Sequence, residues 1–239
     1  MVIIVRIQIW HVHCRPVKSP IIGTLSEKGL HADIKDFLVQ PGDKIECPVD
    51  GFVADILRDD LLIEIQTQNF GAMRKKLTHL LGYYPVHLVH PIAVERIIIW
   101  QDAEGKVIKK RKSPKKGRAI NIFEELVYIR DLVMHPNLTF EILMTREEVI
   151  RRQDPKRKKW KGWYVYDRGL VEVVDRIVLG SFKDFKNLLP DDLPTPFTNK
   201  ELAEMLECTT RHAGSITYTL RRMGVIREVG KRGNAILYL

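Results

Sequence analysis

Two acidic residues occupy positions from which they could bind one divalent cation. Asp55 lies in Val-Ala-Asp-Ile, and Glu64 and Gln66 lie in Leu-Ile-Glu-Ile-Gln-Thr. Because side chains alternate along a strand, Glu64 and Gln66 share one face, and the neighbouring isoleucines share the other, buried face. If Asp55 lies on the adjacent strand, across a turn at residues 58–60, the two carboxylates converge. Magnesium prefers such oxygen ligands and keeps waters for chemistry. On spacing alone, a pair of solvent-facing strand carboxylates is an equal alternative.

The elements around these residues follow from the spacing of the apolar side chains. Leu25 to Leu38 is predicted as an amphipathic helix that ends at Gln40-Pro41-Gly42-Asp43. It carries Glu27, and one turn later His31, which either steadies the site or packs on the helix surface. The remaining elements are predicted as strands over 45–57 and 61–66, a helix over 70–81, and strands over 86–94 and 96–100. This order predicts an α/β fold in which helices cover a mixed sheet.

Asp55 followed by Glu64-Ile65-Gln66 resembles the motif of the PD-(D/E)xK nuclease superfamily, in a variant whose final lysine is a glutamine. The resemblance implies a restriction-endonuclease-like fold. It also implies a metal-dependent DNA endonuclease that hydrolyses phosphodiester bonds with Mg²⁺ or Mn²⁺. Asp55, Glu64 and the carbonyl of Ile65 would hold the metal, Glu27 would assist, and Gln66 would orient the attacking water.

Two positions depart from this motif. Ala54 stands where a proline is usual, which is of little consequence. Gln66 can orient a water but cannot supply positive charge or act as a base, so the metal would carry most of the work. The resemblance further implies that Gln68 or Lys76, in or near the helix after the motif, touches substrate. The chain from about Ile22 onward also resembles an uncharacterised bacterial family of nuclease-like proteins, through Gly23-Thr24-Leu25, residues 64–70, the run at 111–115 and the C-terminal region.

The charge balance predicts a polyanionic partner. A formal net charge of +9 over 239 residues favours DNA or another nucleic acid, with an anionic membrane surface second. The three cysteines are far apart in the sequence and indicate neither a disulfide framework nor a zinc site, which favours a cytoplasmic location. We find no apolar run of about 18 residues that would span a bilayer.

Two basic stretches are candidates for phosphate contact. Residues 105–118 are interrupted by Pro114 and Gly117 and are predicted as a basic loop or hairpin arm. The stretch 151–161 lies beside Trp160 and Trp163, which could stack on unpaired bases, although phosphate contact is favoured. The simpler alternative is that both stretches are solvated loops. The predicted nucleic-acid contacts in the first stretch are Lys110, Arg111, Lys112, Lys115 and Lys116.

The C-terminal 43 residues have the pattern of a winged helix-turn-helix. Thr198 and Glu201 form a capping box before one helix, a second helix runs from Thr210 to Met223, and Gly224 ends it. A hairpin follows around residues 230–234. The resulting prediction places Arg211, His212 and Ser215 at base edges, and Lys231 and Arg232 at phosphate or the minor groove. A winged helix that contacts protein is the alternative.

The predicted organisation has five parts. They are an N-terminal extension or strand (1–21), a nuclease-like core (22–104), a basic arm with a middle α+β segment (105–187), a linker (188–196) and the winged helix (197–239). Two other functions stay open, namely a DNA-binding regulator with a degenerate core and an RNA-processing nuclease. A homodimer is also considered, because two-fold symmetry eases double-strand cutting.

Overall fold

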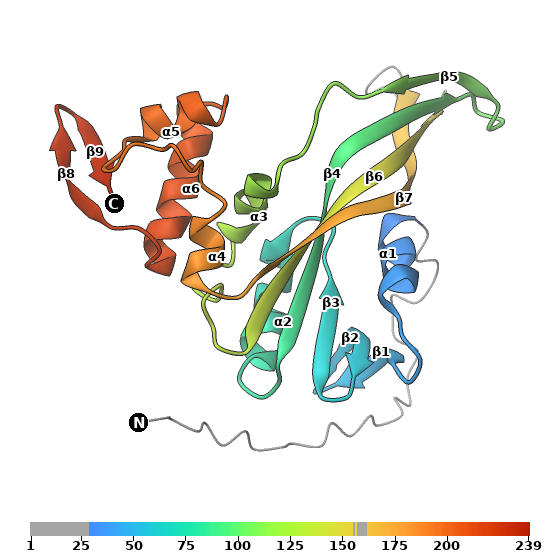
Figure 1. Ribbon diagram of the computed structural model, residues 1–239. Helices are drawn as coiled ribbons and strands as arrows, with labels where there is room; N and C mark the ends of the chain where they lie inside the picture. Colours follow the sequence, from blue (N-terminus) through green and yellow to red (C-terminus); the bar gives the residue numbers. More distant parts are fainter. Residues whose placement is uncertain (1–28, 155, 157–161) are drawn as a thin grey trace.

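One mixed sheet organises the protein (Figure 1). The computed structural model describes residues 29–154, 156 and 162–239. The elements, in chain order, are α1 (Leu30–Leu38), β1 (Lys44–Val49), β2 (Phe52–Arg58), β3 (Leu61–Ile65), α2 (Phe70–Leu80), β4 (Val86–Gln101), β5 (Val107–Lys112), the 3-10 turn η1 (Ala119–Ile122), α3 (Phe123–Leu126), β6 (Leu138–Gln153), β7 (Trp163–Leu179), α4 (Phe182–Lys186), α5 (Asn199–Met205), α6 (Thr210–Met223), β8 (Glu228–Arg232) and β9 (Ala235–Tyr238).

The sheet has seven strands in the order β1-β2-β3-β4-β6-β7, with β5 paired to β4. Strands β1, β2 and β3 form an antiparallel meander, after which α2 crosses over so that β4 runs parallel to β3. Strand β6 is parallel to β4, and β7 is antiparallel to β6. The predicted α/β architecture with a mixed sheet flanked by helices is therefore confirmed.

The strands bury apolar side chains on both faces of the sheet. Alternate residues of β3 belong to different clusters, since Leu62 packs with α2 and Ile63 packs with α1. On the α2 side, the buried stripe of the helix consists of Phe70, Met73, Leu77 and Leu80. On the α1 side, Leu30, Ile34 and Leu38 pack on β2, β3 and β4. Strands β2 and β3 therefore lie between α1 on one face of the sheet and α2 on the other.

The sheet extends further along the sequence than predicted. Residues 86–101 form one strand rather than two, with an irregularity in its pairing to β6 between Ala93 and Glu95. The polar Glu95 and Arg96 mark the point where the strand leaves the core. Strands β6 and β7 belong to the same sheet, so it joins the predicted core to the predicted middle segment. The helix predicted from Phe123 to Leu132 is shorter, because α3 ends at Leu126.

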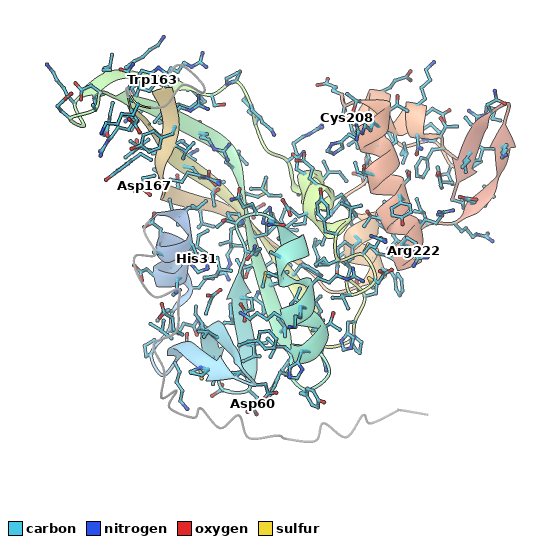
Figure 2. All side chains as sticks on the ribbon, turned by 180° about the vertical axis from the view of Figure 1, so that it is seen from behind. His31, Asp60, Trp163, Asp167, Cys208 and Arg222 are labelled. Atoms are coloured by element: carbon cyan, nitrogen blue, oxygen red, sulfur yellow. The ribbon has the colours of Figure 1, made fainter. Side chains whose placement is uncertain are left out.

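Beyond the core, the distal part of the sheet forms a projecting arm, at the upper right of Figure 1. We use the term arm for residues 95–112, 146–153 and 163–172. Its added strand is β5, which pairs antiparallel with β4 from Ile97↔Lys112 to Gln101↔Val107. Of the two predicted alternatives for residues 105–118, a basic loop or a hairpin arm, residues 107–112 form one strand of a hairpin with β4. Trp163 lies toward the end of this arm in Figure 2, whereas Trp160 lies outside the described residues.

The C-terminal module, residues 197–239, consists of α5, α6 and the β8–β9 hairpin. Its predicted caps are confirmed: Thr198 and Glu201 form a capping box, and Gly224 ends α6 with φ 79°. The module shares a hydrophobic cluster with the sheet, and Leu188, Leu189 and Leu193 pack against that cluster. The predicted linker is thus packed on the rest of the protein.

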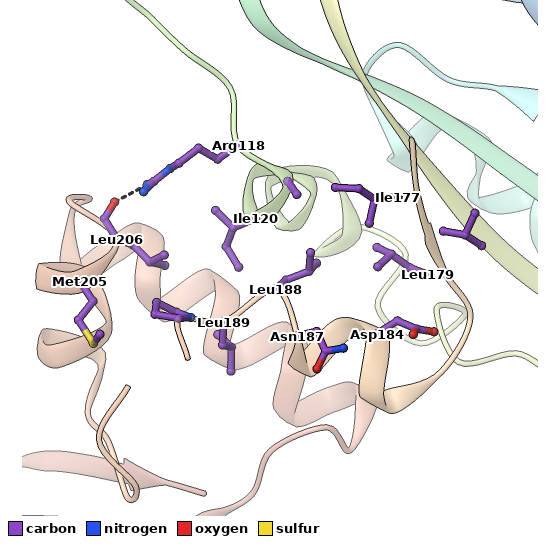
Figure 3. Close-up of a pocket in the computed structure, with 13 residues that line it drawn as sticks. Arg118, Ile120, Ile177, Leu179, Asp184, Asn187, Leu188, Leu189, Met205 and Leu206 are labelled. Atoms are coloured by element: carbon purple, nitrogen blue, oxygen red, sulfur yellow. Dashed lines mark hydrogen bonds between the residues drawn. The ribbon is translucent and has the colours of Figure 1, made fainter. Parts of the chain in front are cut away.

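A cavity of about 520 Å³ lies between the sheet and the C-terminal module (Figure 3). Its lining comes from the end of β7, from η1, from α4 and the chain after it, and from the end of α5. At its rim the Arg118 guanidinium donates a hydrogen bond to the carbonyl of Leu206. In the part of the chain that the structure describes, we find no helix with the length and apolar character needed to cross a bilayer.

Candidate functional site

The two predicted carboxylates lie together on the β2–β3 hairpin. The pairing of Ile56 with Ile63 sets the register, so Asp55 stands across from Glu64. The turn between the strands is at the predicted place, with Asp59 in the left-handed region at φ 51°. Instead of continuing the backbone ladder, the Asp55 side chain accepts a hydrogen bond from the Ile65 N–H at 2.7 Å.

Glu64 is a buried acid with one hydrogen-bonded and one open oxygen. The residue is 1% exposed, and its Oε2 lies 2.5 Å from the Lys76 Nζ of α2. Its Oε1 has no hydrogen-bond partner among the described residues. Burial raises the pKa of the Glu64 carboxyl to about 7, opposed by the charge of Lys76 and reinforced by that of Asp55. A buried acid with a free oxygen is suited to bind a cation that enters the site.

Asp55 is held in the ionised form. Burial alone would raise the pKa of its carboxyl, but hydrogen bonds from His31 and from the Ile65 N–H, with the charges of His31 and Lys76, outweigh burial and lower the pKa. The His31 Nε2 lies 3.3 Å from Asp55 Oδ2. Of the two interpretations of His31, the contact with the carboxylate is the one observed, and Figure 2 shows where this histidine lies on α1.

Lys76 places a positive charge beside the two carboxylates. Its Nζ contacts Glu64 and also donates to the carbonyl of Val53 at 2.6 Å. The Gln66 amide nitrogen donates instead to the carbonyl of Gln68, and to that of Asn69 at 3.3 Å. The site therefore contains two carboxylates and an ammonium group, with Gln66 forming the turn that leads into α2.

The donor set at this site fits a hard divalent cation. Asp55 and Glu64 supply carboxylate oxygens, and one of these is the open Oε1 of a buried acid. In a strand, the N–H and C=O of one residue point to the same side. The Ile65 carbonyl therefore points to the side on which its N–H meets Asp55. Among the described residues no group of three or more His, Cys, Asp or Glu has metal-binding geometry, and the predicted assistant Glu27 lies outside them.

The predicted basic contacts of the arm divide into two groups. Lys110 forms an ion pair with Glu148 at 2.9 Å, and Lys112 forms one with Glu95 at 2.5 Å. Arg111 instead lies over the ring of Trp100, 5.4 Å from its centroid. Further along the chain, Lys115 lines a cavity of about 180 Å³ beside β4, and Lys116 is exposed.

In the C-terminal module, the predicted contacts lie at the start of α6 and on the hairpin. Arg211 is exposed, whereas His212 Nδ1 is 3.9 Å from Glu124 Oε1. The Ser215 hydroxyl donates to the Arg211 carbonyl at 3.3 Å. On β8, Lys231 is exposed and Arg232 pairs with Glu201 at 2.7 Å. One side of α6 thus faces the segment around α3, and its N-terminal end is open.

The predictions from sequence did not assign Lys76 to the pair of carboxylates. Its signal was nevertheless present, because Lys76 directly precedes Leu77 of the buried α2 stripe and so lies at the edge of the face that meets the sheet. His31 was left between two roles because α1 and β2 meet only in the folded chain. Both residues act on carboxylates that local pattern had located.

The fold and site define a mixed α/β protein with a buried carboxylate and lysine cluster. The chain belongs to the family described as a domain of unknown function, DUF8091, which it matches over residues 28–180. This match covers the sheet and ends before the C-terminal module. The chain is 32% identical over 219 residues to an uncharacterized protein of Treponema pallidum (strain Nichols), covering 91% of this chain and 86% of that one. No solved structure matches the chain.

Proposed function

We propose that this protein is a metal-dependent DNA endonuclease that hydrolyses phosphodiester bonds at the Asp55–Glu64 site. One observation carries the proposal: Asp55 and Glu64 converge around Lys76, and Glu64 keeps a buried oxygen without a partner. A buried polar atom without a partner costs free energy, and a cation bound at Glu64 would recover that cost. The net charge of +9 agrees with a polyanionic substrate.

The residues of the site have distinct roles in this proposal. Mg²⁺ or Mn²⁺ would be held by Asp55, Glu64 and the carbonyl of Ile65. When bound, it would polarise the scissile phosphate and lower the pKa of a bound water. His31 positions Asp55 and keeps it ionised. Lys76 supplies a positive charge to the phosphate oxygens as negative charge develops on them, the role that the motif gives to the missing lysine.

Gln66 retains a secondary role. Its amide nitrogen is engaged with carbonyls of the following turn, so its amide oxygen is the atom that would accept a hydrogen bond from the attacking water. Glu27 remains a proposed assistant from outside the described residues. These assignments make Lys76 more important for hydrolysis than Gln66.

The order of the elements supports a restriction-endonuclease-like core. Helix α1, a three-stranded antiparallel meander, the crossover helix α2 and the parallel strand β4 follow one another without interruption. The carboxylates lie on the second and third strands of the meander, next to the crossover. A pair of carboxylates on adjacent antiparallel strands before a crossover helix supports the proposed core.

The C-terminal module supports targeting to DNA as a winged helix. Two capped helices precede the β8–β9 hairpin, and Arg211 and Lys231 are exposed at the two places where such a module touches DNA. Because His212 faces Glu124, contact with the groove would come mainly from Arg211 at the start of α6. Arg232 would reach phosphate by leaving Glu201.

The test compares cleavage by four proteins: the wild type, Asp55→Asn, Lys76→Met and the control Asp59→Asn. Asp59 is an exposed aspartate of the same hairpin, and asparagine accepts its left-handed backbone. Each protein is incubated with duplex, single-stranded and branched DNA and with structured RNA, in Mg²⁺, Mn²⁺ or chelator.

We expect metal-dependent DNA cleavage by the wild type and the control alone. DNA that is shifted but left intact by all four proteins would favour the regulator, and cleavage of RNA in preference to DNA would favour the RNA-processing enzyme. Cleavage that survives Asp55→Asn would remove the carboxylates from the mechanism.

A further inference from the structure

The two faces of the arm differ in how their positive charges are compensated. On one face Lys109, Arg111 and Arg151 surround Trp100, at 6.0, 5.4 and 6.0 Å from the ring centroid. Within the described part of the chain, no carboxylate lies at ion-pair distance from these three cations. On the other face, Lys110 and Lys112 are each paired with a glutamate.

The strand register explains this division. Trp100 pairs with Lys109 on β5 and with Arg151 on β6, and Ile98 pairs with Arg111. Residues that pair directly, or that lie two apart on one strand, share a face. We call the set Trp100, Lys109, Arg111 and Arg151 the Trp100 face. Lys110 and Lys112 necessarily point to the other side.

The positive charge continues along the sheet toward the catalytic site. Arg96 and Arg168 both contact Glu147, which is 1% exposed, so two guanidinium groups share one buried carboxylate and leave an excess positive charge. Both arginines line the cavity of about 180 Å³ that Lys115 also lines. Two acids, Glu124 and Glu125, line it as well, and Glu125 accepts a hydrogen bond from the Phe70 N–H at 2.8 Å.

The same cavity reaches the end of the catalytic motif. Thr67 is part of its lining and directly follows Gln66. The His90 ring, which also lines the cavity, donates from Nδ1 to the Gln66 carbonyl at 2.6 Å. Basic side chains therefore extend from the arm to the carboxyl end of β3, next to the carboxylate site. Those of the Trp100 face have no carboxylate at ion-pair distance among the described residues, whereas Arg96 and Arg168 share Glu147.

We propose that the Trp100 face binds the sugar–phosphate backbone of DNA and guides it to the carboxylate site. This inference rests on the proposed function and adds where the substrate lies outside the catalytic centre. From Arg96 to Trp100 the strand advances ~13 Å, the axial length of roughly four base pairs. Cations without carboxylate partners gain most from phosphate, since no ion pair has to break first.

An anionic membrane surface would also attract these cations. The row of basic side chains that runs from the Trp100 face to the cavity beside Thr67 favours nucleic acid, because an extended backbone can follow the curved sheet and a flat bilayer cannot. Lipid binding is therefore treated as a competing outcome of the test.

The experiment uses two charge-matched double variants of the full-length protein. Lys109→Gln with Arg111→Gln removes two cations from the Trp100 face, and Lys110→Gln with Lys112→Gln removes two from the opposite face of the same strand. Binding to fluorescein-labelled duplex and single-stranded DNA is measured by anisotropy in chelator, from 0.05 to 0.3 M salt. Chelator separates binding from cleavage, so failure of the catalytic proposal does not affect the result.

We expect the Trp100-face variant alone to lose about 2 from the slope of log affinity against log salt on duplex DNA, because each phosphate contact contributes ~0.9. If the variant and the wild type bind equally at 1 M salt, this change in slope makes the variant bind roughly 60-fold more weakly than the wild type at 0.1 M salt. Equal losses in both variants, or none in either, would overturn the proposal. So would variants that bind DNA normally but no longer bind vesicles of anionic phospholipid. Circular dichroism verifies that both variants are folded, and Arg151→Gln provides an independent change on the same face from β6.

Discussion

The free energy of unfolding should fall as the pH rises through 7 in metal-free protein, because the Glu64 carboxyl ionises in a buried site. Its pKa is about 7 in the folded protein, against the ordinary glutamate value of 4.5. A group whose pKa is higher in the folded than in the unfolded chain favours folding below the unfolded value, and this advantage is lost as the pH rises through the folded value. The resulting loss between pH 5 and pH 8 is roughly 2.5 kcal/mol.

Glu64→Gln removes this ionisation while keeping the size and one hydrogen-bond acceptor of the side chain. Urea unfolding at pH 5, 6, 7 and 8 in chelator should therefore show a flatter pH dependence in the variant than in the wild type, by about the ~2.5 kcal/mol derived for the carboxyl. Other titrating groups are common to both proteins and cancel in the comparison. A variant that follows the wild-type pH dependence would show that the pKa of Glu64 is not raised in the folded protein.

Adding Mg²⁺ extends the same assay to the proposed metal site. A ligand that binds only the folded state stabilises it in proportion to RT ln(1 + [L]/Kd). Since the cation competes with the proton for Glu64, Mg²⁺ should restore more stability to the wild type at pH 8 than at pH 5. It should do little for Glu64→Gln. Equal stabilisation of both proteins at both pH values would refute the assignment of Glu64 as a ligand.

Three further predictions concern single side chains. Lys76→Met should lower the single-turnover rate of DNA cleavage by roughly 100-fold or more. Its DNA binding in chelator, measured by anisotropy, should be unchanged. An equal loss of cleavage and of binding would make Lys76 a binding residue. Burial would raise the pKa of Glu141, but hydrogen bonds from His87 and Arg176 outweigh it and lower the pKa to about 2. The contribution of Glu141 to the free energy of unfolding should therefore be complete above pH ~4.5. It should fall by roughly 2 kcal/mol as the pH drops toward 2. Urea unfolding of Glu141→Gln should lack that fall. A variant that loses stability in acid as the wild type does would contradict the prediction. Thr198→Ala should lower the free energy of unfolding by ~1 kcal/mol, because α5 loses its N-cap. Thr195→Ala is the control, since Thr195 caps none of the described helices.

The parts of the site that sequence could predict are those set by local pattern. Alternation along residues 61–66 placed Glu64 on a face opposite to its neighbouring isoleucines, and the short turn placed Asp55 on the adjacent strand. In the C-terminal module, capping residues at Thr198 and Gly224 located helix ends within a residue. Each of these signals acts within a few residues of the chain.

Contacts between distant elements could not be predicted in the same way. The parallel pairing of Val86 with Leu138 joins strands about 50 residues apart, and no pattern in either strand specifies its partner. The arm gives the clearest example. Alternation separates Lys109 and Arg111 from Lys110 and Lys112. Only the second pair forms ion pairs, because Glu148 of β6 and Glu95 of β4 lie on its face. Only the register decides which cations remain uncompensated.

The C-terminal module and helix α2 contact the same short segment, residues 125–131. Asp131 binds Arg74 of α2 at 3.2 Å and Arg222 of α6 at 3.0 Å, while Glu125 of α3 accepts the Phe70 N–H at the start of α2. Arg130 also lies 5.5 Å from the centroid of the Tyr218 ring on α6. These contacts, together with the packed segment 188–196, fix α6 relative to the helix that carries Lys76. DNA held by the open end of α6 would therefore reach the carboxylates from one direction, set by the fold rather than by a flexible linker.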